Sequence, residues 1–175
     1  MQDVIGAKWG RPVKRLHEAF SAFLPYSVAA FFLFFLCIRF DLLGAHEVYS
    51  WIKDPHLLDA FPGKNVWLQR DFMIARDVVS LLIILSLAKW HMDQTIRGDF
   101  FLLEGKKEEA KIFAEEARKK LGYWSAPILC VYSICFSILC FDLTMSLAPT
   151  WFSTLWAGWS FSIVMQTILA FILVF

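Results

Sequence analysis

The chain has 175 residues, of which 58% are hydrophobic, and it carries a net charge of only +1. Soluble domains contain roughly 45–50% apolar residues, so this composition argues against a water-soluble domain and favours a membrane protein. The small net charge, without a clustered basic face, argues against nucleic-acid binding.

Four apolar stretches predict an all-α integral membrane protein, with residues 1–175 forming a single membrane domain. A hydrocarbon core of about 30 Å requires about 20 mainly apolar residues in a helix. The second stretch is the weakest by hydropathy, because its uninterrupted apolar run is short. The four transmembrane helices are expected at about residues 19–40, 72–89, 126–147 and 151–175.

The connecting segments differ in character. Residues 41–71 contain prolines and aromatic residues that suit the level of the lipid headgroups. The segment from 89 to 125 is charged, and within it residues 104–121 predict an amphipathic surface helix, either a solvated connector or a face for a partner. Residues 148–150 link the last two spans so closely that an antiparallel helical hairpin is expected.

Lysine and arginine counts predict the orientation. Four of these residues precede the first span and eight lie in the second connector, whereas the first connector has three and residues 148–150 have none. Because cytoplasmic loops are enriched in such residues, the N-terminus and the second connector are expected in the cytoplasm. The chain ends in apolar sequence at Phe175, which suggests a piece of a longer protein.

The sequence shows no catalytic, metal-binding or cofactor-binding motif of its own. No glycine-rich phosphate loop, serine elbow or metal-spaced cluster occurs. A haem b ligated by two histidines needs them on facing helices, and none lies within an expected span. The four cysteines lie in apolar stretches, and the last three are spaced by five residues, so they do not share a helix face. This spacing argues against a metal site or a disulfide and favours a role as small core residues. The histidines are His17, His46, His56 and His91, and the cysteines are Cys37, Cys130, Cys135 and Cys140.

Four polar residues within the expected spans are candidates for a proton path, because ionisable groups are costly in hydrocarbon. Arg76 and Asp77 lie near the start of the second span, and Asp142 lies near the end of the third. Both positions fall on the expected periplasmic side, so these three could form a cluster. Gln166 lies deep in the fourth span. The alternative is that these groups only join helices by hydrogen bonds.

Residues 141–154 resemble the D-W-x-M-S-L-[DE]-P-H-W-[FY]-S-T motif of the ActF-type membrane subunit of alternative complex III, a quinol:electron-acceptor oxidoreductase. Weaker similarities lie at residues 6–18, 65–77 and 125–127, in the order found in that family. Three positions differ, with Leu143, Ala148 and Thr150 in place of the family's Trp, acidic residue and His. The matching residues are Asp142, Met145, Ser146, Leu147, Pro149, Trp151, Phe152, Ser153 and Thr154.

The resemblance implies a four-helix portion of an NrfD/polysulfide-reductase-like helical bundle in the bacterial inner membrane. It implies a non-catalytic subunit that binds no cofactor and supports proton translocation coupled to quinol oxidation in partner subunits. The implied partners are a second NrfD-like membrane subunit, an iron–sulfur subunit and a multihaem cytochrome c subunit. Quinone or menaquinone, iron–sulfur clusters and haem c would belong to those partners. A structural membrane anchor and a small transporter are the alternatives.

Overall fold

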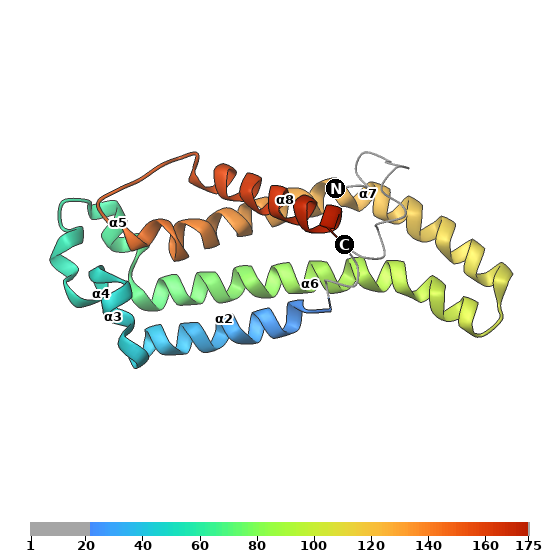
Figure 1. The fold of residues 1–175 in the computed structure, drawn as a ribbon, viewed down its shortest axis with the longest axis horizontal. Helices are drawn as coiled ribbons and strands as arrows, with labels where there is room; N and C mark the ends of the chain where they lie inside the picture. Colours follow the sequence, from blue (N-terminus) through green and yellow to red (C-terminus); the bar gives the residue numbers. More distant parts are fainter. Residues whose placement is uncertain (1–21, 175) are drawn as a thin grey trace. The chain divides into compact units, whose positions relative to one another are not determined.

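The computed structural model describes residues 22–174, apart from the side chains of residues 46, 55, 98, 99 and 172–174. The basic N-terminal residues and the start of the first expected span lie outside the described residues. Every regular element within residues 22–174 is a helix, which confirms the expected all-α class. In chain order the elements are α2 (Leu24–Arg39), η1 (Leu42–Gly44), α3 (Ala45–Val48), α4 (Ser50–Lys53), η2 (Pro55–Leu58), α5 (Pro62–Trp67), α6 (Arg70–Leu103), α7 (Lys107–Leu143), η3 (Met145–Leu147) and α8 (Trp156–Val174) (Figure 1).

The charged segment between the second and third expected spans is almost entirely helical. Here α6 continues to Leu103 and α7 begins at Lys107, so only three residues interrupt the helices. The segment is rich in Glu, Lys and Ala, which are strong helix formers. Gly105 adopts a φ of +79° at the break, a conformation that glycine takes without strain. Of the amphipathic helix expected over residues 104–121, residues 107–121 are helical and form the first part of α7.

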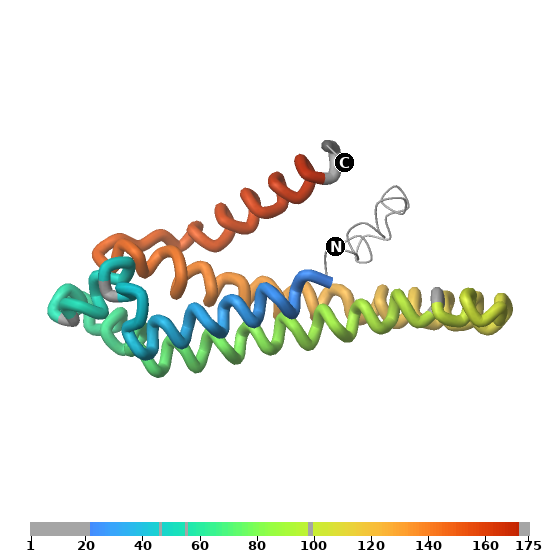
Figure 2. The backbone as a smooth tube through the Cα atoms, turned by 60° about the horizontal axis from the view of Figure 1, so that its bottom comes forward, coloured from blue at the N-terminus to red at the C-terminus, as the bar shows by residue number. Residues whose placement is uncertain are grey.

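The described residues fall into two compact units. Among the described residues, the first unit comprises residues 22–25 and Ile83–Ser133. In it the later part of α6 and the earlier part of α7 run antiparallel, as both ribbon and tube views show (Figure 2). The rings of Phe101 and Phe113, from the two helices, lie 5.7 Å apart between centroids. On α7 a buried stripe repeats at helical spacing and comprises Ala110, Ala117, Leu121 and Ser125.

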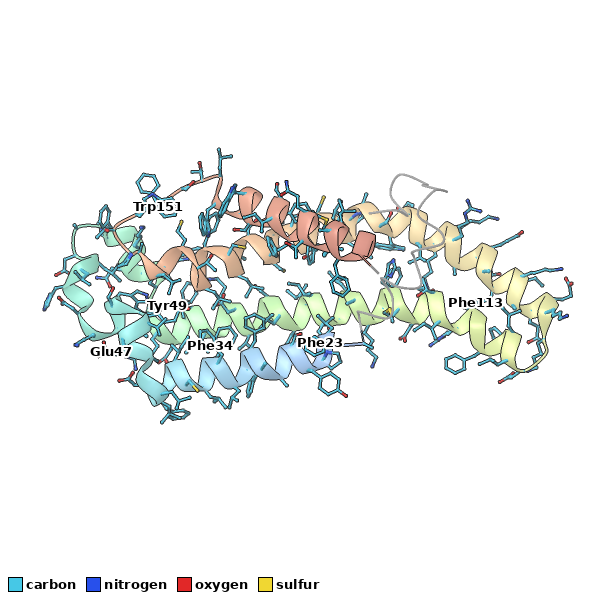
Figure 3. The ribbon with its side chains drawn as sticks, viewed as in Figure 1. Phe23, Phe34, Glu47, Tyr49, Phe113 and Trp151 are labelled. Atoms are coloured by element: carbon cyan, nitrogen blue, oxygen red, sulfur yellow. The ribbon has the colours of Figure 1, made fainter. Side chains whose placement is uncertain are left out.

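The second unit comprises Tyr26–Leu82 and, among the described residues, 134–174. Its core joins α2, the short helices that follow it and the first turns of α6. The rings of Phe34 on α2 and Tyr49 after α3 lie 6.3 Å apart between centroids, and Figure 3 labels both. The buried apolar residues of this core are Phe35, Ile38, Ala45, Tyr49, Trp51, Leu58, Leu68, Met73 and Leu81.

The link between the last two long helices is longer than the three residues expected. The helix α7 ends at Leu143 and α8 begins at Trp156, so the first residues of the fourth expected span are not helical. The Nζ atom of Lys64 donates hydrogen bonds to the carbonyls of Pro149 and Trp151, both at 2.7 Å. These carbonyls are thereby bound outside any helix. The helix in the fourth expected span, about residues 151–175, therefore begins at Trp156.

Within the described residues, length and composition mark one helix as able to cross a membrane, the stretch Lys107–Leu147. Two shorter apolar helices, Leu24–Arg39 and Trp156–Phe171, fall below that length. The prediction of four transmembrane helices therefore stays a prediction.

Candidate functional site

Three of the four candidate residues come together in the second unit. Arg76 and Asp77 lie in the second turn of α6, and Asp142 lies in the last turn of α7. The side chains of Asp77 and Asp142 are fully buried. Gln166 lies on α8 with an exposed side chain and takes no part in this cluster. The structure thus places the residues of the second and third expected spans at one site.

Asp142 is the acceptor at the centre of the cluster. Its Oδ2 accepts hydrogen bonds from Nε of Arg76 at 2.9 Å and from Nη2 at 2.5 Å. Its Oδ1 accepts a hydrogen bond from Nε1 of Trp67 at 2.7 Å. A carboxylate that accepts several such bonds has its charged form stabilised. Asp142 therefore accepts three N–H hydrogen bonds, two of them from a guanidinium whose side chain is only 12% exposed.

Arg76 is held by aromatic rings as well as by its ion pair. Its guanidinium lies 3.7 Å from the ring centroid of Trp67 and 4.8 Å from that of Phe72. Its Nη2 also donates to the backbone carbonyl of Trp67 at 3.2 Å. Arginine stacks well on aromatic faces because its guanidinium is planar and weakly hydrated. The stacking fixes the direction in which Arg76 presents its donors to Asp142.

Asp77 differs from Asp142 in having no N–H donor within the described part of the chain, although the charge of Arg76 also acts on it. Both of its oxygens are buried, and no donor among the described residues binds them. The carboxyl groups of Asp77 and Asp142 are nevertheless close enough to share a hydrogen bond. Nη1 of Arg76 and Nε1 of Trp51 are also buried without a partner among the described residues. Two carboxyl groups and one guanidinium thus lie together in a buried region.

Tyr49, which lies between the short helices α3 and α4, contacts the end of α7 next to Asp142. Its hydroxyl donates a 3.0 Å hydrogen bond to the carbonyl of Leu143, one residue beyond Asp142. Burial, and then the charge of Asp77, raise the pKa of Tyr49 to about 12. The phenol therefore keeps its proton at physiological pH and acts as a fixed donor.

Serine and threonine hydroxyls at the end of α7 hold the backbone beside Asp142. The hydroxyl of Ser146 donates to the carbonyl of Asp142, within the buried part of the unit. The hydroxyl of Thr144 donates to the carbonyl of Cys140 at 2.6 Å and accepts from Nε1 of Trp156 at 2.7 Å. The last contact ties the end of α7 to the start of α8. It helps to fix the position from which Asp142 points inward.

Lys64 contacts the segment that follows Asp142. Besides its two carbonyl contacts, its Nζ lies 5.4 Å from the ring centroid of Phe61 and 5.9 Å from that of Phe152. Burial lowers the pKa of Lys64, as expected for an ammonium group partly removed from water. Lys64 therefore acts as a structural clamp on residues that include the family-like motif.

Sequence reasoning missed the roles of Trp67, Tyr49 and Lys64. The aromatic residues were interpreted as headgroup-level anchors, and Lys64 entered only the charge count. The similarity at residues 65–77 contains both Trp67 and Arg76 and was the available signal. The contacts of Trp67, Tyr49 and Lys64 join residues 75 to 94 positions apart, which no local periodicity encodes.

The carboxyl groups of Asp77 and Asp142 and the guanidinium of Arg76 can hold charge, and the carboxyl groups can bind protons. No group of three potential metal-binding residues occurs among the residues that the structure describes. Comparison with protein-family models, curated proteins and solved structures finds no match.

Proposed function

We propose that this chain is a membrane subunit of a quinol:electron-acceptor oxidoreductase complex of the alternative complex III type, and that its buried cluster handles protons. The observation that carries the proposal is the position of Asp142. The aspartate of the family-like motif is fully buried and accepts hydrogen bonds from Arg76 and Trp67. Buried ionisable groups within membrane helices are functional candidates because they are costly to maintain there.

Exposed apolar side chains support a membrane setting. On α2, adjacent large residues such as Phe32 and Leu33 are more than half exposed, and on α8 so are Trp159 and Leu169. Large contiguous apolar surfaces are rare on soluble monomers. Lipid, or helices of partner subunits, would cover these faces and keep their apolar surface away from water.

The proposed arrangement has four spans, with α2, the first half of α6, the second half of α7 and α8 crossing the bilayer. At 1.5 Å per residue, α6 is about 51 Å long and α7 about 55 Å, against about 30 Å of hydrocarbon. Their charged ends would therefore extend as a helical hairpin into the cytoplasm. Arg76, Asp77 and Asp142 would lie toward the opposite, periplasmic side of the bacterial inner membrane.

Cysteine labelling tests this orientation. A membrane-impermeant thiol reagent is expected to label Lys53→Cys in intact cells, because Lys53 lies exposed in the expected periplasmic connector. It is expected to label Lys107→Cys only after the membrane is permeabilised. Labelling of Lys107→Cys in intact cells would contradict the orientation.

Purification from native membranes tests the proposed assembly. A tagged copy, extracted in mild detergent, is expected to bring with it an iron–sulfur subunit, a multihaem cytochrome c and a second NrfD-like membrane subunit. The complex should show the absorption of c-type haem after reduction and should oxidise a quinol. A chain that purifies alone, with neither haem c nor quinol oxidation in its fraction, would count against this function and favour the small transporter.

A further inference from the structure

The contacts of the two buried carboxyl groups divide their roles. Asp142 accepts three N–H hydrogen bonds from Arg76 and Trp67. Asp77 accepts none from any described residue, although it is equally buried. The charge of Arg76 acts on Asp77, but Arg76 donates no hydrogen bond to it. A buried carboxylate without a hydrogen-bond donor is unfavourable in an apolar interior, and such a group instead holds a proton.

The surroundings of Asp77 leave the other carboxyl group as its hydrogen-bonding partner. Arg76, next to it on α6, directs Nε and Nη2 to Asp142. Tyr49, from the turn between α3 and α4, directs its hydroxyl to the carbonyl of Leu143. The side chains that α2 contributes to this core, Phe35 and Ile38, are apolar.

A hydrogen bond between the two carboxyl groups requires a proton on one of them, because ionised carboxylates are acceptors only. Asp142 has its oxygens occupied by N–H donors, so the proton belongs on Asp77. We propose that Asp77 and Asp142 form a carboxyl pair that binds one exchangeable proton, carried by Asp77 and directed at the ionised Asp142.

The carboxyl pair would be the proton-binding site of the proposed proton-handling role. The purpose of the pair rests on that proposed function. When the proton leaves, the O–H bond of Asp77 breaks and its electron pair stays on the carboxylate. Two negative charges would then face the single guanidinium of Arg76. A proton returning from water would restore one negative and one positive charge. Asp77 is thus the proton carrier, and Asp142 with Arg76 forms the charged partner that sets its environment.

Infrared spectroscopy tests this assignment without quinol turnover. The purified protein, with any partner subunits that accompany it, is compared with its Asp77→Asn variant at neutral pH. The difference spectrum should show loss of one carbonyl band of a protonated carboxylic acid, and that band should shift down in D₂O. Asp142→Asn should also abolish the band, because Arg76 would then stabilise an ionised Asp77.

The amide group that Asp77→Asn introduces can donate a hydrogen bond to Asp142 as the protonated acid does, so this variant should accumulate and fold like the wild type. An unchanged carboxylic-acid region in Asp77→Asn would overturn the proposal. Failure of Asp77→Asn to accumulate would also overturn it, because a neutral side chain that donates a hydrogen bond should replace a protonated aspartate. Neither result depends on whether the chain belongs to a quinol-oxidising complex.

Discussion

Replacing Arg76 with Met is expected to destabilise the protein by about 3–5 kcal/mol, because it leaves the buried Asp142 carboxylate without its cation. The substitution removes both hydrogen bonds to Oδ2 and the stacking on Trp67. Burial decides the size of the effect, since Asp142 is fully buried and Arg76 only 12% exposed. Chemical unfolding of the purified protein in detergent measures the loss.

Arg39 provides the matched control. Its Nε lies 2.9 Å from Oδ1 of Asp71, but the two side chains are 50% and 66% exposed. Exposed ion pairs contribute about 0–1 kcal/mol, so Arg39→Met should change the unfolding free energy little. Equal losses in the two variants would contradict the assignment of Arg76 and Asp142 as a buried pair.

A double variant separates two free energies: the net contribution of the ion pair to stability, and the loss of stability when only one partner is removed. Removing both partners of a buried ion pair in favour of apolar residues is often neutral or stabilising. Arg76→Met combined with Asp142→Leu should therefore recover most of the stability lost in Arg76→Met alone. A double variant less stable than the single one would show that the two residues act independently.

The sequence predicted the all-helical class and the positions of the apolar stretches, because hydropathy records which residues avoid water. Hydropathy does not mark where a helix ends. The residues after the second apolar stretch are charged but strong helix formers, so α6 continues to Leu103. Residues 151–153 are apolar or small but not helical, and Lys64 binds the carbonyls of Pro149 and Trp151 in this segment.

The cluster itself could be predicted only in outline. The cost of charge in hydrocarbon singled out Arg76, Asp77 and Asp142, and the expected topology placed them at one depth. The same reasoning selected Gln166, whose side chain the structure leaves exposed on α8. Arg76 pairs with Asp142, which also accepts a hydrogen bond from Trp67. This choice of partner depends on packing between segments far apart in the sequence, so the sequence alone does not predict it.

Asp142→Asn is expected to leave the complex assembled but to lower the number of protons moved per electron. The variant keeps the shape of the side chain, and its amide oxygen still accepts from Arg76 or Trp67. Arg76 loses its counterion, so its charge acts on Asp77 and favours the ionised form of that carboxyl group. The site would then hold one carboxylate and one guanidinium permanently, with no proton to exchange.

Asp59→Asn provides the control for loss of a carboxylate. Asp59 is exposed in the first connector, where its Oδ2 lies 2.9 Å from Nδ1 of His56. This contact raises the pKa of His56, and its removal should leave proton movement unchanged. A purely structural anchor predicts a different pattern, in which Asp142→Asn impairs assembly without a separate coupling defect.

The proton-to-electron ratio of the assembled Asp142→Asn complex tests the proton-handling role most directly. The complex is reconstituted into vesicles, quinol oxidation is started, and proton movement and electron transfer are recorded together. We expect electron transfer to continue with a clearly lower ratio than in the wild type and in Asp59→Asn. An assembled Asp142→Asn complex with an unchanged ratio would contradict the proton-handling role of this cluster.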